Sequence, residues 1–144
     1  MDQISIFEPM IALAGLTFLA LLNVPIRRFA SAFRGQTTRN DYKFGESDKV
    51  PGYVAIANRN LMNLLEMPVL FYVVSLSLYT TGLVSPLQVW FAWAYVALRA
   101  AHSVVHLTFN HVLVRLTVFA ISNVMLALMW VNFVRDLAAA RGGL

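Results

Sequence analysis

The sequence contains no cysteine, and charged residues make up only 12% of its 144 residues. Without cysteine the chain itself forms no disulfide, no thiolate metal site and no cysteine nucleophile, so any thiol chemistry needs a thiol from a substrate. A soluble domain of this size carries about twice that charged fraction, whereas 59% of these residues are hydrophobic. The two shortages argue against a soluble domain and predict an integral membrane protein.

Acidic residues are also scarce, which leaves a net charge of +4 at pH 7. This excess is not spread over the chain, because six of the eleven Lys and Arg residues lie between Arg27 and Lys49. Such a cluster is typical of a loop beside a membrane and not of a surface that binds DNA or RNA. We therefore expect no nucleic-acid partner.

Four apolar segments are present, and each has about the 20 residues that are needed to cross a bilayer. They cover residues of about 4–26, 54–80, 87–109 and 112–134, and residues 27–53 form the long polar loop. The predicted fold class is an all-α membrane protein, an up-down bundle of four transmembrane helices in a single domain over residues 1–144. The first segment is preceded by Asp2 and by no Lys or Arg, so it is not expected to be a secretory signal.

Loop charges predict the orientation of this multi-pass protein. The loop at 27–53 is strongly basic, while the connection around 81–86 carries no charge. Basic loops stay in the cytoplasm, so both termini are expected on the non-cytoplasmic side. The third connection, Asn110 and His111, is so short that the third and fourth helices must form an antiparallel hairpin.

The second segment carries polar residues where a membrane helix is normally apolar. Arg59, Asn63 and Glu66 are spaced i, i+4 and i+7, which places them on one helical face. Charge inside a bilayer costs several kcal/mol, so it usually faces the bundle interior and usually has a function. Pro68 follows and is expected to kink the helix just after Glu66. Polar contacts that only join helices are the competing interpretation.

Arg99, His102 and His106 share one face of the third segment, at i, i+3 and i+7. Two histidines at such spacing can ligate a metal or haem, but packing histidines are the more frequent case, and we expect no metal site. Arg115, at the start of the fourth segment, is either an anchor at the membrane boundary or a cation directed into the cleft between helices. Three cations, Arg59, Arg99 and Arg115, then face one acid, Glu66, which favours an anionic ligand with two carboxylates.

The second-segment pattern, Arg59-x-x-x-Asn63-x-x-Glu66-x-Pro68, resembles the signature of the MAPEG family, the membrane-associated proteins in eicosanoid and glutathione metabolism. The run from Arg99 to His106, followed by Asn110 and Arg115, is also similar to this family, in particular to its bacterial members. The resemblance covers nearly the whole chain. It implies a left-handed bundle that assembles as a homotrimer, in a bacterial inner membrane, with glutathione bound between neighbouring subunits near the cytoplasmic face.

By the same resemblance, Arg59, Asn63 and Glu66 hold the charged and amide groups of glutathione, the co-substrate, and Arg115 stabilises its thiolate. Arg99, His102 and His106 complete the implied glutathione site. The eicosanoid-forming members carry tyrosines where this chain has His102 and His106, which is its main departure from the family pattern.

Three interpretations of function therefore remain open. The first is a glutathione-dependent transferase or peroxidase that acts on lipophilic electrophiles, with Arg115 as the catalytic residue. The second is a non-catalytic membrane protein that binds a lipid or an anionic metabolite in the same cleft. The third is a proton or ion pathway through Glu66, His102 and His106, which a bundle with one central acid favours least.

Overall fold

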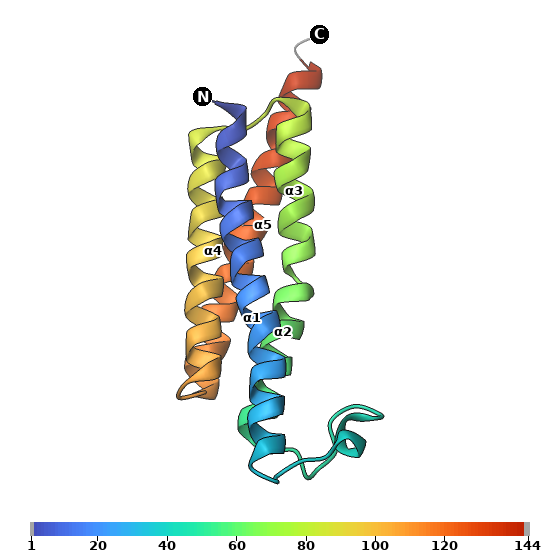
Figure 1. The fold of residues 1–144 in the computed structure, drawn as a ribbon. Helices are drawn as coiled ribbons and strands as arrows, with labels where there is room; N and C mark the ends of the chain where they lie inside the picture. The colour runs from blue at the N-terminus through green and yellow to red at the C-terminus, as the bar shows by residue number, and fades with distance from the viewer. Residues whose placement is uncertain (1, 143–144) are drawn as a thin grey trace.

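Long helices make up most of the chain in the computed structural model, which describes residues 2–142. Helix α3 continues the line of α2 beyond a short break at Glu66 and Met67, so the helices form four rods (Figure 1). This arrangement confirms the all-helical fold class. The helices are α1 (Phe7–Phe33), preceded by the 3₁₀ turn Gln3–Ile6, α2 (Gly52–Leu65), α3 (Pro68–Thr81), α4 (Pro86–Leu107) and α5 (Val112–Gly142).

The rods lie side by side, and neighbours in the chain run in opposite directions (Figure 1). Helix α4 packs along α5, as the short connection at Asn110 and His111 predicts, and α1 packs on α2. Helix α4 also contacts α1 and α2, so it has α5 on one side and α2 on another. The start of α1 and the end of α5 lie at one end of the bundle, and the long loop lies at the other end (Figure 1).

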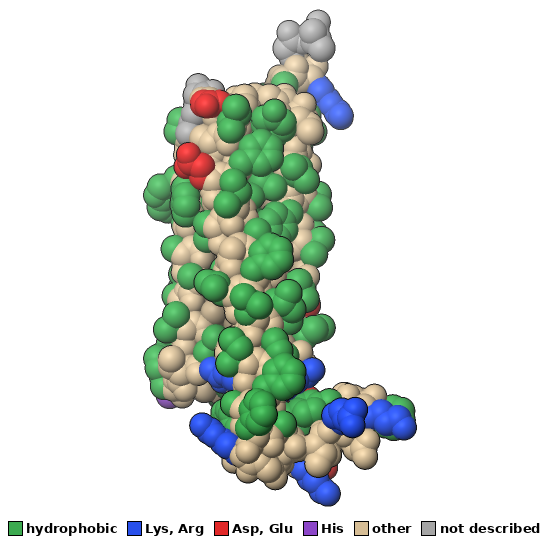
Figure 2. All heavy atoms as spheres, in the orientation of Figure 1, with side chains coloured by type: hydrophobic (Ala, Val, Ile, Leu, Met, Phe, Trp, Pro, Cys, Tyr) green, Lys and Arg blue, Asp and Glu red, His purple; other side chains and the backbone are tan. Residues whose placement is uncertain are grey.

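The inside and the outside of the bundle are both apolar. Inside, Phe71 and Tyr95 are fully buried and stack with ring centroids 5.0 Å apart. Outside, hydrophobic side chains cover the length of the face shown in Figure 2, and Lys and Arg gather at the loop end. A protein in water rarely exposes so large an apolar surface, whereas a bilayer accepts it without cost.

Three of the four rods are long and apolar enough to cross a membrane, namely Gln3–Phe33, Gly52–Thr81 and Val112–Gly142. Helix α4 is the exception among the rods, although its 22 residues have the required length. Its polar residues Gln88, Arg99, His102 and His106 lower its mean hydropathy, and all four side chains are buried. The one rod that falls short of a membrane span in hydropathy is therefore the one that carries these polar groups into the bundle interior.

Two helices continue beyond the limits predicted from hydropathy. Helix α1 ends at Phe33 and not near residue 26, and α5 ends at Gly142 and not near residue 134. Hydropathy marks where the apolar stretch stops, but a helix continues past that point when polar residues still favour it. Arg27 and Arg28 are consequently helical. Arg27 donates to the Tyr53 carbonyl oxygen at 2.7 Å, which joins the end of α1 to the start of α2.

The connecting loop, residues 34–51, is organised around Asp41. The backbone N–H and the hydroxyl of Thr38 donate to Asp41 Oδ2 at 2.7 and 2.8 Å, and the Ser47 hydroxyl donates to Oδ1 at 3.0 Å. These hydrogen bonds, led by the one from the Thr38 backbone, hold the pKa of Asp41 below its ordinary value of 3.8. Arg28 on α1 forms an ion pair with Glu46 of the loop, with 3.5 Å between Nη2 and Oε1, and this pair joins the loop to α1.

We expect Asp41→Asn to loosen this loop, because an amide accepts these hydrogen bonds less strongly than a carboxylate. Cleavage by trypsin after the loop's basic residues should become about fivefold faster. Folding lowers the pKa of Asp41, so the ionised carboxylate stabilises the folded loop fully above pH 3.8. This stabilisation is lost as the pH falls through the lower pKa that Asp41 has in the folded protein. Asp48→Asn is the control, an identical change at an exposed position of the same loop. Equal cleavage rates in the two variants would contradict this role of Asp41.

Candidate functional site

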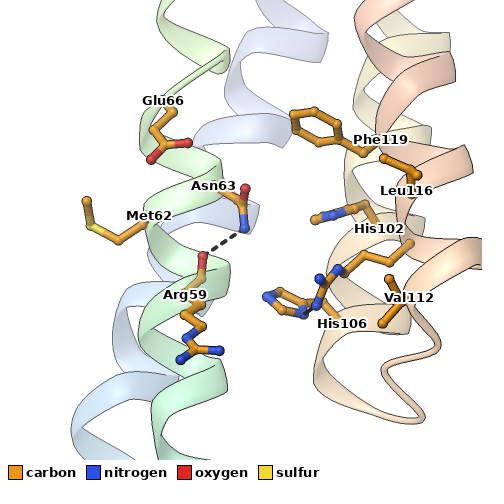
Figure 3. A pocket seen from close by; sticks show the side chains of 10 residues that line it. Arg59, Met62, Asn63, Glu66, His102, His106, Val112, Leu116 and Phe119 are labelled. Atoms are coloured by element: carbon orange, nitrogen blue, oxygen red, sulfur yellow. Dashed lines mark hydrogen bonds between the residues drawn. The ribbon is translucent and has the colours of Figure 1, made fainter. Parts of the chain in front are cut away.

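The largest group of predicted site residues surrounds one cavity, here called the inner cavity. Its volume is about 460 Å³, and its lining residues come from α2 and the residue that follows it, α4 and α5. Figure 3 shows the α2 side chains on one side of the space and those of α4 and α5 on the other. The lining residues are Arg59, Met62, Asn63, Glu66, His102, His106, Val112, Arg115, Leu116 and Phe119.

A second space, the outer cavity, continues from the inner cavity toward the loop. Its volume is about 550 Å³, and it shares Arg59, His106 and Arg115 with the inner cavity. The inner cavity ends among the apolar side chains of Leu116 and Phe119, whereas the outer cavity ends among polar loop residues. The three shared side chains therefore mark the junction between a polar compartment and a more apolar one. The loop residues of the outer cavity are Glu46, Ser47, Asp48 and Val50.

Helix α2 supplies Arg59 and Asn63, and Glu66 follows at its C-terminal end. The structure places all three on the inner cavity, as their spacing predicts. Arg59 and Glu66 are exposed, while Asn63 is partly buried. The Asn63 side-chain amide donates to the Arg59 carbonyl oxygen at 2.9 Å, so its nitrogen is engaged by its own helix and its oxygen is left for a ligand (Figure 3). The wall thus presents one cation, one amide oxygen and one carboxylate.

The predicted kink after Glu66 is present as a complete break in the helix. Pro68 begins α3 and has no N–H to offer the preceding turn, and Glu66 ends α2 with ψ near −88°. The break leaves the Asn63 carbonyl without its usual helical donor. The guanidinium of Arg99, from α4, donates to this oxygen instead. A cation from one helix therefore satisfies the backbone that a proline disrupts in another.

Arg99 is consequently not a lining residue, although the sequence predicts it as a ligand-binding one. Its side chain is completely buried behind the inner cavity, between the Asn63 carbonyl and the ring of Phe119. The Arg99 guanidinium carbon lies 5.5 Å from the centre of that ring, a distance suited to a cation–π interaction. Arg99 thus connects α2, α4 and α5, and it reaches the cavity only through its electric field.

His102 and His106 form the α4 wall, and both are almost fully buried, with 3% and 2% of their surface exposed. Their ring centroids are 5.7 Å apart, so they line the cavity as a pair. His102 Nδ1 and His106 Nε2 have no hydrogen-bond partner among residues 2–142. A buried polar atom without a partner carries a free-energy cost that a ligand can remove.

Arg115 extends from the first turns of α5 to the junction of the two cavities. Its Nη1 donates to Asn110 Oδ1 at 2.8 Å and lies 3.1 Å from His106 Nδ1. His106 Nδ1 in turn lies 3.0 Å from Asn110 Oδ1. The sequence indicated Arg115 and His106 but not the part played by Asn110, whose signal is an asparagine in the short connection between α4 and α5.

This arrangement suits an anion. Two arginines face the cavities, a third is buried behind them, and the start of α5, the positive end of its helix dipole, lies beside Val112 in the cavity wall. Glu66 offers one group for a cationic part of the same ligand. No group of three or more metal-ligating side chains occurs in the described part of the chain. The apolar side chains of Met62, Leu116 and Phe119, which sequence patterns did not single out, suit an apolar part of a ligand.

Comparison with known proteins identifies a matching family. The family model described as MAPEG family matches residues 6–135, which include every residue that lines the two cavities. No curated protein matches the chain, and no solved structure matches it.

Proposed function

Since the chain belongs to the MAPEG family, we propose that it is a membrane-embedded transferase or peroxidase that uses glutathione against lipophilic electrophiles. The observation that carries this proposal is the junction of a polar cavity and a more apolar cavity at Arg59, His106 and Arg115. A reaction between a polar thiol peptide and a lipophilic molecule needs such a boundary.

The two cavities fit glutathione in size and in chemistry. Their volumes, about 550 and 460 Å³, lie in the range of small-molecule sites. Glutathione has two carboxylates and two amide groups, for which the cleft offers arginines and the amide of Asn63. Glu66 and the loop acids of the outer cavity offer partners for its ammonium group. In this proposal Arg59, Asn63, Glu66, His102 and His106 hold the peptide.

Arg115 is the residue that we propose as catalytic. Glutathione supplies a thiol, which reacts as a thiolate, and a guanidinium beside the sulfur favours that form. Arg115 is fixed through Nη1 by Asn110, which leaves its remaining N–H groups for the cavity. The apolar walls at Leu116 and Phe119 exclude water, which strengthens this electrostatic effect.

We further propose that the protein is a homotrimer. Arg59 and Glu66 are exposed on one subunit although they lie within the transmembrane rod Gly52–Thr81. A charge that faces lipid at this position costs several kcal/mol, so a neighbouring subunit that covers α2 would remove the penalty. The site would then be complete only in the assembly. The basic loop end would face the cytoplasm, and a bacterial inner membrane fits that orientation.

Arg59→Ala tests glutathione binding on the α2 wall. We expect the affinity, measured by calorimetry on detergent-purified protein, to fall about tenfold, because one charge-assisted hydrogen bond to a carboxylate is lost. Arg39→Ala is the matched control, since Arg39 is an exposed arginine of the loop that lines neither cavity. No glutathione binding by the wild type, or equal loss in both variants, would contradict the proposed site.

Turnover tests the proposed activity itself. Purified protein with saturating glutathione should conjugate a broad-spectrum electrophile such as an aryl halide or reduce a lipid hydroperoxide. Absence of both reactions would leave the fold and the family intact and would refute the transferase and peroxidase functions.

A second candidate function is non-catalytic binding of a lipid or an anionic metabolite in the same cleft. The observation in its favour is the pair of buried histidines, His102 and His106, in place of the tyrosines of eicosanoid-forming members. Retention of a ligand without turnover would support it. Turnover that disappears in Arg115→Ala would exclude it.

A further inference from the structure

Asn110 has a backbone conformation that few residues adopt. Its φ of +44° is the only positive value at a non-glycine position among residues 2–142. Asparagine is one of the residues that tolerate this left-handed conformation. The Asn110 N–H donates to the Val105 carbonyl oxygen at 2.8 Å, which closes the end of α4 before α5 starts at Val112. The turn conformation therefore sets where the Asn110 side chain points.

That side chain reaches the two functional groups at the junction of the cavities. Asn110 Oδ1 accepts from Arg115 Nη1 at 2.8 Å and lies 3.0 Å from His106 Nδ1. An amide oxygen has two lone pairs, so it can accept from both groups at once. Both hydrogen bonds form when the imidazole proton is on Nδ1. His106 Nε2 then carries a lone pair in a buried position without a partner in the described chain.

We propose that Asn110 is a positioning residue that fixes the Arg115 guanidinium and the His106 tautomer, so that a cation and a proton acceptor stand side by side in the cleft. The alternative arrangement has Arg115 Nη1 donate to His106 Nδ1, which are 3.1 Å apart. It would place the proton on Nε2 and leave Asn110 Oδ1 and His106 Nδ1, 3.0 Å apart, with two facing lone pairs. The lone-pair repulsion disfavours it.

The consequence for chemistry rests on the proposed function. His106 Nε2 can accept the proton that leaves a thiol while the electron pair of the S–H bond stays on sulfur. Arg115 favours the negative charge that results. His106 thus takes the proton and Arg115 stabilises the negative charge, and Asn110 in the turn holds both side chains in place.

The first arm of the test needs no ligand. Nitrogen-15 NMR of histidine-labelled protein reports which ring nitrogen of His106 carries the proton, and His106→Gln identifies the signal. We expect Nδ1–H in the wild type and a shift to Nε2–H in Asn110→Gly, because glycine keeps the positive φ but has no side-chain acceptor. Asn110→Asp should retain Nδ1–H, since it restores the oxygen. A wild type that has Nε2–H, or an unchanged tautomer in the glycine variant, would overturn the proposal.

The second arm measures ionisation of bound glutathione by thiolate absorbance. In Asn110→Gly the thiol pKa should rise by about one unit, because Arg115 is no longer held in place. His111→Ala, an exposed change in the same turn, should leave it unchanged. If the wild type binds no glutathione, the proposed function fails and the NMR arm still decides the role of Asn110. If it binds glutathione and the glycine variant retains both tautomer and thiol pKa, the role of Asn110 is refuted.

Discussion

Replacing Arg115 with alanine is expected to lower kcat for glutathione conjugation roughly 100-fold, which is the effect of removing one donor that stabilises a charge in a water-excluded site. Glutathione affinity should change much less, because Arg59, Asn63 and Glu66 on the opposite wall remain. A loss in kcat without a matching rise in KM is the sign of an interaction with the reacting charge and not with the ground-state ligand.

Steady-state kinetics and calorimetry on the same preparation separate these two effects. Arg135→Ala is the control, because Arg135 lies near the far end of α5 and is exposed. Arg115→Lys should recover only part of the activity, since lysine keeps the charge but lacks the planar fork that binds Asn110 and a ligand together. Full activity in Arg115→Ala would remove Arg115 from the catalytic role.

Arg99→Ala is expected to lower the free energy of unfolding by about 3 kcal/mol, the usual range for truncating a large side chain that is completely buried. The Arg99 side chain has no exposed surface, and it joins the Asn63 carbonyl on α2 to Phe119 on α5. Its removal leaves a cavity at the point where three helices meet and a backbone oxygen without a donor.

Unfolding of the detergent-solubilised protein, followed by circular dichroism, measures this loss. Arg99→Met separates its two causes, because methionine refills most of the space and provides no donor. Both variants lack the buried charge and the donor, so we expect the methionine variant to be more stable than the alanine variant because it leaves a smaller cavity. An alanine variant as stable as the wild type would show that Arg99 does not connect the helices.

Much of this site was predictable from the α2 segment alone. Arg59, Asn63 and Glu66 share a helical face by their spacing, and a proline after them predicts a kink at their level. The structure places all three on one cavity with the break directly beyond them. The apolar segments and the short connection at Asn110 and His111 likewise predict the bundle and its α4–α5 hairpin. Local patterns were sufficient for these features because each depends on residues close in the sequence.

Arg99 shows what such patterns cannot give. Its spacing from His102 and His106 places it on the cavity face of α4. In the structure, however, its side chain is buried and donates to the Asn63 carbonyl oxygen. That contact depends on how far two helices are apart and on a backbone oxygen that becomes free only because the neighbouring helix is broken. No residue type marks a free carbonyl in a sequence. The role of Asn110 is likewise set by contacts between side chains that only the folded hairpin brings together.

The two walls of the inner cavity come from two separate segments of the chain, which bears on how the protein changes over evolution. Every α2 residue that lines the inner cavity precedes Met67, and every other lining residue lies in the single hairpin of α4 and α5. One short segment, from Arg99 to Arg115, therefore contains both imidazoles and the proposed catalytic guanidinium. Substitutions there would alter the chemistry of the cleft while the wall formed by α2 stays unchanged.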